Sequence, residues 1–236
     1  MPETVTRYSV NDFVNSTGEK STGSNFFELE SQRILAVNLS NNLAWTKRGS
    51  MIAYTGDVKF EMEDLFEHGI KTVVKRFITK ESGNLVKATG TGRVYVSDCG
   101  KKISVINLEN DTLIANGSAV LAFEPSIKWD IKLQKLTAMM SGGLTNIKME
   151  GTGMVALSTS YDPLTLKVTP GNPVYTDPTA TVAWSGGLEP TMKADLNIKS
   201  LIGRGSGDVI QMKFEGNGFV IVQPDSINYG PAIPME

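Results

Sequence analysis

Three segments of the chain repeat one alternation of apolar and polar positions around a pair of glycines. Each reads apolar, Lys, apolar, any residue, Gly, any residue, Gly, any residue, Val, any residue, apolar. The segments are residues 86–96, 147–157 and 212–222. Apolar side chains at every second position place one face of a β-strand on a core. Because paired glycines allow a tight turn, the pattern predicts a β-hairpin with one buried face in each segment.

A second landmark repeats upstream of the glycine pairs. A turn residue is followed each time by a short apolar strand, and these turn residues are Gly49, Gly117 and Pro178. Two landmarks with nearly the same period predict an internal repeat. We therefore expect three β units between a polar lead-in and a tail. The boundaries are 1–26 for the lead-in, 27–97, 98–160 and 161–224 for the units, and 225–236 for the tail.

The first unit is longer than the others, and its additional residues lie near 67–80. Ile70, Val73, Val74 and Phe77 follow the i, i+3, i+4, i+7 spacing of an amphipathic helix. The spacing predicts one short helix that covers the edge or end of a sheet. A helix that binds a partner is the alternative.

The composition agrees with an all-β globular protein. The chain has 236 residues, of which 40% are hydrophobic and 20% charged, and its 23 Gly and 10 Pro favour short strands joined by tight turns. The formal net charge of -2 does not call for a polyanionic partner. The basic pairs fit exposed turns; they are Lys47–Arg48, Lys75–Arg76 and Lys101–Lys102.

Cysteine usage and the N-terminus predict a cytoplasmic location. Cys99 is the one cysteine, so no internal disulfide can form, as is typical of a reducing compartment. We expect no secretory signal, because the N-terminal residues lack a basic region followed by an apolar core. No apolar run approaches the roughly 20 residues of a membrane span, so we expect no transmembrane segment. Cys99 stands between Asp98 and Gly100 and is interpreted as a loop residue without a neighbouring base.

Metal and catalytic chemistry find little support in the sequence. His68 is the single histidine, so two histidines, or several histidines and cysteines, cannot form a metal cluster within one chain. A Ser-His-Asp triad would need His68, and no Gly-x-Ser-x-Gly elbow accompanies it. We therefore predict no catalytic, cofactor-binding or metal-binding residues and no cofactor. Paired carboxylates are present at Glu61, Glu63 and Asp64 and at Glu28 and Glu30. Glu61 and Glu63 are two apart, opposite apolar residues, as on the solvated face of a strand.

Three tryptophans could stack on bases or sugars, or could anchor a core. Trp45 and Trp184 occupy nearby positions in the repeated blocks, and Trp129 follows the corresponding strand of the second unit. This placement favours structural anchors.

The landmarks taken together resemble a known family. Residues 48–54, 151–157, 182–186 and 216–224 are similar to the corresponding segments of the AIM24 family, which includes a mitochondrial inner-membrane biogenesis factor and uncharacterised bacterial proteins. The resemblance implies a fold similar to the tryptophan-RNA-binding attenuation protein (TRAP-like). Each unit would then be a small β-sandwich of the short double-stranded β-helix type, with three units around a pseudo-threefold axis. The family brings no accepted catalytic residues, and the absence of a transit-peptide pattern indicates a bacterial member.

Three functions stay open at this point. The first is a non-enzymatic binding or scaffold protein that acts through protein–protein assembly, as a homo-oligomer or with a protein partner, because β units leave strand edges to be paired. The second is a module that binds nucleic acid or a small ligand, by analogy with the TRAP-like fold. The third is an enzyme with an unrecognised carboxylate site.

Overall fold

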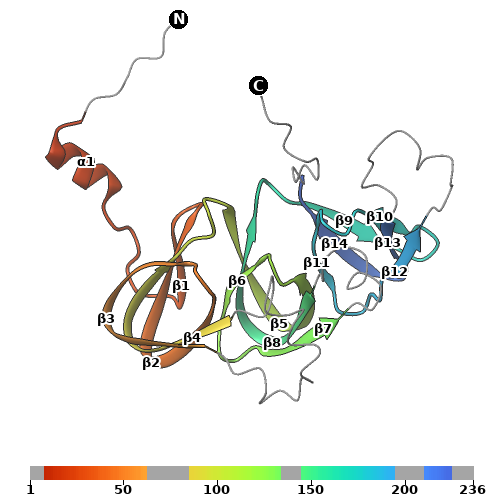
Figure 1. Cartoon of the computed structure of the whole chain (residues 1–236), viewed down its shortest axis with the longest axis horizontal. Helices are drawn as coiled ribbons and strands as arrows, with labels where there is room; N and C mark the ends of the chain where they lie inside the picture. The colour runs from red at the N-terminus through yellow and green to blue at the C-terminus, as the bar shows by residue number, and fades with distance from the viewer. Residues whose placement is uncertain (1–7, 63–84, 134–144, 195–209, 225–236) are drawn as a thin grey trace, which may run out of the picture.

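The computed structural model describes residues 8–62, 85–133, 145–194 and 210–224, whose regular secondary structure is almost entirely β-strand (Figure 1). One short helix, α1 (Val10–Thr17), precedes the strands. The strands are β1 (Phe27–Ser31), β2 (Ile34–Lys47), β3 (Met51–Met62), β4 (Leu85–Val96), β5 (Lys102–Asn116), β6 (Val120–Phe123), β7 (Lys128–Leu133), β8 (Thr145–Thr159), β9 (Leu164–Val168), β10 (Val174–Thr176), β11 (Thr181–Ser185), β12 (Thr191–Ala194), β13 (Ile210–Phe214) and β14 (Gly218–Val222). The predicted all-β class is confirmed.

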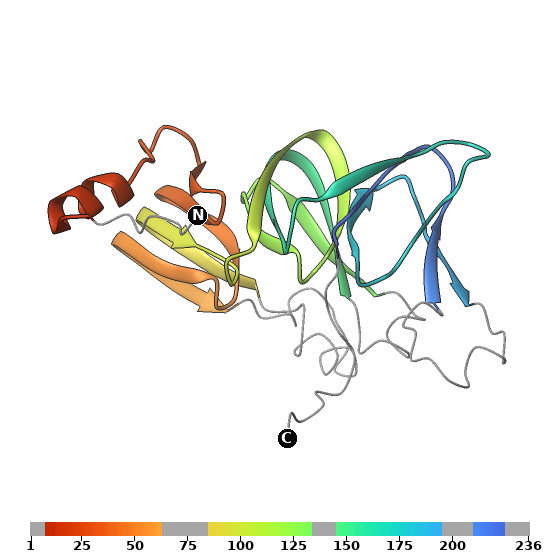
Figure 2. The same ribbon diagram turned by 90° about the horizontal axis from the view of Figure 1, so that it is seen from above.

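Most of these strands belong to one antiparallel sheet that runs the length of the molecule. Its order is β3-β4-β2-β6-β8-β5-β11-β14-β9, with β1 paired to β2 and β7 paired to β8. A second sheet has the order β10-β13-β12. Seen from above, three groups of strands stand in a row from the N-terminal to the C-terminal end (Figure 2).

The three groups pair their strands in the same way. In the first group β4 lies between β2 and β3, and in the second β8 lies between β5 and the two strands β6 and β7. In the third group β14 lies between β9 and β11, while β13 lies between β10 and β12. The predicted unit boundaries and the pseudo-threefold axis stay predictions, because β3 and β10 are not paired among the described residues.

The first two glycine pairs lie inside the central strands β4 and β8, and the third lies where β13 ends and β14 begins. Because β13 and β14 do not pair with each other, the prediction of a hairpin at each pair is wrong. β4 and β8 run unbroken through theirs, although Gly90 and Gly151 have φ angles of 131° and 122°. A Cβ on Gly90 would overlap the carbonyl oxygen of Asp57 on β3. Glycine is therefore required for the close approach of two strands, which is the second use of this residue besides turns.

A β-bulge accompanies the glycine pair in both of the first two groups. On β2 the register shifts between Ser40 and Asn42, and Asn41 adopts a φ of 52°. The same shift occurs on β5 around Asn110, whose φ is 64°. The backbone N–H of Asn41 donates to Thr91 Oγ1 at 3.0 Å, and that of Asn110 donates to Thr152 Oγ1 at 3.1 Å. The threonine between the two glycines thus satisfies the bulge, which bends the long strands locally.

Each group has its own buried apolar cluster. The first cluster includes Leu35, Val37, Val94 and Val96, and the second is built around Phe123, Ile147, Met149 and Val155. The third is smaller and contains Val168, Trp184, Leu188, Met212, Phe214 and Val220.

The tryptophans anchor these clusters, as the sequence predicted. Trp45 stacks on Phe123 with ring centroids 6.1 Å apart, and Trp129 meets Trp45 edge-on at 5.5 Å. Trp184 is buried and packs edge-on against Phe214 at 5.5 Å. Such pairs contribute beyond the burial of their area.

Two short strands join one group to the next. β6 of the second group pairs with β2 of the first, and β11 of the third pairs with β5 of the second. Side chains cross with them: Leu121 on β6 is buried in the first cluster, and Val182 on β11 is buried in the second. The sheet is continuous because the second and third groups each pair one strand with the group before.

A carboxylate fixes the first joint. Asp98, in the connection after β4, accepts hydrogen bonds from Lys47 Nζ at 2.9 Å, Lys101 Nζ at 3.0 Å and Ser158 Oγ at 2.6 Å. Burial raises the pKa of this carboxyl, but the hydrogen bonds from Ser158 and Lys47 outweigh burial and hold the pKa below its ordinary value.

The lead-in differs from the sequence prediction. It holds helix α1, which begins at the Ser9 cap, where Ser9 Oγ accepts from Asp12 N at 3.1 Å. The polar composition of residues 1–26 gave no sign of a helix. The apolar residues of α1 are only Val10, Phe13 and Val14, and all three are exposed. The helix predicted near 67–80, together with His68, lies outside the described residues.

We expect Gly90→Ala to destabilise the fold by about 2–4 kcal/mol, because a Cβ would strain the backbone and push β3 away. The urea midpoint should fall accordingly. Gly187→Ala is the control, since a Cβ there meets nothing within 4 Å. Equal effects of the two substitutions would contradict the close-approach role.

We expect Asp98→Asn to lower the free energy of unfolding at pH 7 by about 1–3 kcal/mol, because two lysines lose a charged acceptor. Folding lowers the pKa of Asp98, so its contribution is full above the unfolded value near 3.8 and is lost as pH falls through the folded pKa. Urea titrations at several pH values measure this. Asp162→Asn, at a side chain 81% exposed, is the control and should change stability little.

Candidate functional site

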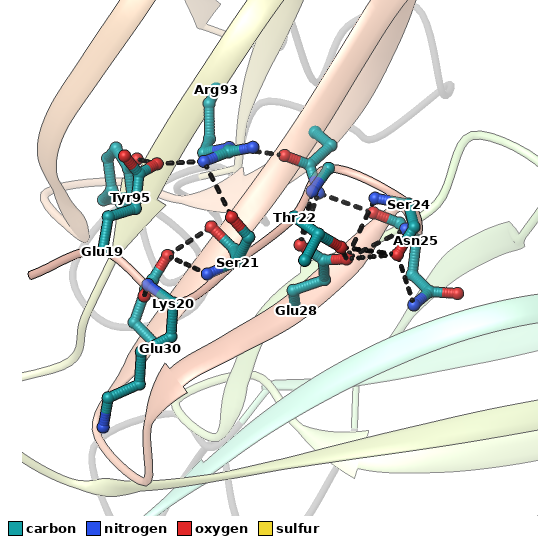
Figure 3. Close-up of polar contacts among 12 residues, drawn as sticks. Glu19, Lys20, Ser21, Thr22, Ser24, Asn25, Glu28, Glu30, Arg93 and Tyr95 are labelled. Atoms are coloured by element: carbon teal, nitrogen blue, oxygen red, sulfur yellow. Dashed lines mark hydrogen bonds and ion pairs between the residues drawn. The ribbon is translucent and has the colours of Figure 1, made fainter.

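Residues 19–25, here called the strap, lie along the first group of strands. Figure 3 shows the strap held by carboxylates of β1 and by Arg93 of β4. Asn38 on β2 adds a contact, since its Nδ2 donates to the carbonyl of Asn25 at 2.6 Å. This group of polar contacts contains Glu28 and Glu30, a carboxylate pair that the sequence had marked.

Glu28 is wrapped by backbone N–H groups of the strap. Its carboxylate accepts from Gly23 N at 2.9 Å, Ser24 N at 3.0 Å and Asn25 N at 3.1 Å. The hydrogen bond from the Gly23 backbone, followed by that from Asn25, lowers the pKa of Glu28 to about 2 against the cost of desolvation. The group is thus ionised across the physiological range and acts as an acceptor for the chain.

Glu30 and Glu19 are occupied in a similar way. Glu30 accepts from Lys20 N at 2.6 Å and Ser21 N at 3.1 Å. Glu19 accepts from the Tyr95 hydroxyl and forms an ion pair with Arg93. The Tyr95 hydrogen bond, then the Arg93 hydrogen bond, lowers the pKa of Glu19. These carboxylates hold chain segments together.

A cavity of about 470 Å³ lies beside the strap. Its walls include Gly23, Ser24, Asn38, Ser40 and Arg93. The Arg93 guanidinium already donates from Nε to Asn38 Oδ1 at 2.8 Å and from Nη1 to the Ser21 carbonyl at 3.3 Å. The Arg93 guanidinium is therefore already bound by Asn38 and by the strap, and residues of both the strap and the bulged strand β2 line the cavity.

The other residues considered from the sequence do not gather at one place. Glu61 is exposed on β3, while Glu63 and Asp64 lie outside the described residues. Cys99 is exposed in a turn with a φ of 50°. Within residues 8–62, 85–133, 145–194 and 210–224, no three His, Cys, Asp or Glu side chains are grouped as a metal would need. None of the helices in these ranges is long and apolar enough to cross a membrane.

Exposed apolar side chains also gather at the start of β3, Met51–Tyr54, here called the β3 edge. Met51, Ile52 and Tyr54 are 42%, 54% and 49% exposed. In the described part of the chain β3 pairs with β4 alone, so its outer backbone groups have no strand beside them. Clustered apolar side chains on an open edge are typical of a binding surface.

A second open edge lies at the other end of the molecule. β10 pairs with β13 alone among the described strands, and its Tyr175 is 44% exposed. The Lys193 ammonium lies 5.4 Å from the centre of the Tyr175 ring. Sequence analysis missed both edges, although the repeated turn residues Gly49 and Gly117 already matched the β3 edge to β6, a strand that is buried in the second group.

We expect the Gly23 amide to titrate with Glu28 at a midpoint of about pH 2, because its hydrogen bond lowers the pKa of that carboxyl from 4.5 to about 2. The contact is complete above the unfolded pKa and is lost as pH falls to about 2. Amide chemical shifts measure this. Glu28→Gln should remove the titration and speed hydrogen exchange in the strap at neutral pH, whereas Glu109→Gln, on an exposed bulge, should do neither. A midpoint at the ordinary pKa of 4.5 would contradict the hydrogen bonds from the strap to Glu28.

Comparisons with known proteins cover most of the chain. A crystal structure of a Streptococcus pyogenes protein, determined by a structural genomics consortium, superposes with a TM-score of 0.66 at 19% sequence identity, over 84% of this chain and 91% of that chain. This likeness shows the fold. No curated protein matches the chain at a significant level.

A family model described as mitochondrial biogenesis AIM24 matches residues 27–225. The match begins at β1 and spans all three groups of strands, while α1 and the whole strap precede it. The resemblance found in residues 48–54, 151–157, 182–186 and 216–224 is therefore confirmed over most of the sequence, and this chain belongs to the AIM24 family.

Proposed function

We propose that this chain is a non-enzymatic scaffold or binding protein that acts through protein–protein assembly. The observation that carries the proposal is the β3 edge, where Met51, Ile52 and Tyr54 are exposed beside unpaired backbone groups. An open edge of this kind can add a strand from another polypeptide, with main-chain hydrogen bonds for affinity and side chains for selectivity. Natural proteins usually protect such edges, so an unprotected one favours a partner.

The polar groups of the chain support this proposal rather than an enzyme. Glu28, Glu30 and Glu19 accept hydrogen bonds from the strap and its neighbours, and Asp98 ties the first joint. Each carboxylate thereby has a structural task, and their lowered pKa values suit acceptors better than proton donors. The single cysteine fits assembly in the cytoplasm of a bacterial cell.

We further propose that the three groups of strands are equivalent TRAP-like units of one internal repeat. Support comes from the shared strand order and from the glycine pairs, whose leading residues Gly90, Gly151 and Gly216 have φ angles of 131°, 122° and 122°. Chains built from repeated units bury each unit against the next and leave the terminal units with one uncovered side. The β3 edge lies on such a terminal unit.

Light scattering on the purified full chain tests the assembly. We expect a mass above the 25.6 kDa of one chain, and we expect Ile52→Lys to restore that single-chain mass, because a charge on the edge opposes strand addition. Leu164→Lys is the matched control on β9, at an apolar residue 57% exposed. The free energy of unfolding of both variants should stay within about 0.5 kcal/mol of that of the native chain.

A native chain that elutes at the single-chain mass at all concentrations, and that recovers no protein from lysate through the β3 edge, would overturn the proposal. An equal loss of mass in Leu164→Lys would contradict the choice of edge.

A further inference from the structure

The two joints within the chain share one register. Where β6 meets β2, Phe123 lies opposite Trp45 and Ala122 lies opposite Thr46. Where β11 meets β5, Trp184 lies opposite Ile114 and Ala183 lies opposite Ala115. In both joints the donated strand contributes an alanine followed by an aromatic residue. Both residues pair with the receiving strand near its C-terminal end.

The β3 edge is the third member of the donated set. A turn closed by a backbone hydrogen bond precedes each donated strand, from Ser50 N to Lys47 O, from Ala119 N to Asn116 O and, in a turn one residue longer, from Thr181 N to Asp177 O. Beyond them the register is the same: Tyr54, Phe123 and Trp184 lie opposite Val94, Val155 and Val220, which are the valines of the repeated glycine motif. Tyr54 therefore corresponds to Phe123 and Trp184.

β10 is the third member of the receiving set. Trp45, Ile114 and Tyr175 lie opposite the motif lysines Lys87, Lys148 and Lys213. Tyr175 therefore corresponds to the residues that receive Phe123 and Trp184. A lysine ammonium lies 5.4 Å from the ring centre at both aromatic members, Lys87 at Trp45 and Lys193 at Tyr175.

Exposure separates the filled joints from the unfilled halves. Phe123 and Trp184 are 0% and 2% exposed, whereas Tyr54 is 49% exposed. Ile52 is 54% exposed, while Leu121 and Val182 at the same position are buried in the cluster of the preceding group. On the receiving side Trp45 is 8% exposed and Tyr175 is 44% exposed.

We propose that a second copy of this chain fills the joint, with the β3 edge of one copy antiparallel to β10 of the next. Tyr54 then lies opposite Tyr175, and Ala53 lies opposite Thr176. This rests on the proposed assembly function and names the partner of the same edge. Both views place β3 and β10 at opposite ends of the row of strands (Figures 1 and 2). The contact is head-to-tail, so repeated addition produces a ring or a filament.

The interface has the chemistry that the internal joints display. The donated β3 edge brings Ile52 to the third cluster, as Leu121 and Val182 reach the first and second. Main-chain groups of β3 and β10 that face no described strand become paired. The aromatic pair Tyr54–Tyr175 takes the place of Trp45–Phe123, whose rings stack at 6.1 Å.

Disulfide trapping between two single-cysteine chains tests the register. In a Cys99→Ser background, one full chain carries Ala53→Cys and a second, differently tagged chain carries Thr176→Cys. After mixing and mild oxidation we expect a mixed disulfide dimer, about tenfold or more above that of a control pair in which Thr191→Cys replaces Thr176→Cys. Thr191 is an exposed residue on β12, at the other edge of the same small sheet.

Three results would overturn the inference. A homodimer of the Ala53→Cys chain alone would show that two β3 edges pair with each other. A disulfide within one chain of an Ala53→Cys, Thr176→Cys double variant, together with no dimer between the two single-cysteine chains, would show that one chain closes its own ring. Equal trapping at Thr191 and Thr176 would show random collision.

Light scattering separates this inference from the assembly function. If trapping fails while the native chain still exceeds the mass of one chain and Ile52→Lys abolishes the excess, assembly through the β3 edge holds and the partner is not β10 of a second copy. If the native chain also has the single-chain mass and the β3 edge recovers no other protein, both proposals fail.

Discussion

The structure depends on the pairing of strand edges between successive groups. A β-strand at the edge of a sheet exposes a row of backbone donors and acceptors, and it is stable in water only when these are solvated or paired. Here β6 covers β2 and β11 covers β5, and each donated strand carries an apolar side chain into the cluster it joins. The first two clusters are thus completed by residues from the following group. The third cluster has no donor within the described chain.

The repeat and the all-β class were predictable because alternation and glycine placement are local patterns. The role of the glycine pairs was not, since a strand that turns and a strand that is closely approached both need glycine. The choice at Gly90 is made by the carbonyl of Asp57, which is 33 positions away in sequence and reaches Gly90 only when β3 pairs with β4. Helix α1 had a local signal, the Ser9 cap with Asp12, but the surrounding polar residues outweighed it.

The carboxylates show a similar limit. Glu28 and Glu30 are two apart on β1 and so lie on one face of that strand. The sequence marked them only as a carboxylate pair, whereas the structure places the strap beside them, with backbone N–H groups as donors. The strap has no periodic pattern of apolar residues, so its sequence does not predict where it binds. A pattern of residues fixes which face a side chain occupies, but long-range packing decides what meets it.

The distribution of charge along the donated strands fits the assembly proposed for the open edge. β6 and β11, with sequences VLAF and TVAWS, carry no charge, and the β3 edge reads MIAY. The strands or strand parts that follow do carry charges: Asp57, Lys59 and Glu61 on β3, and Lys128, Asp130 and Lys132 on β7. Charged side chains are the usual protection of an exposed edge. Charged side chains are thus present on the strands that pair with no neighbouring group and absent from the strands that do. The β3 edge keeps the uncharged composition of the two buried joints although it is itself exposed, and this is the composition that an edge retains when a partner strand covers it.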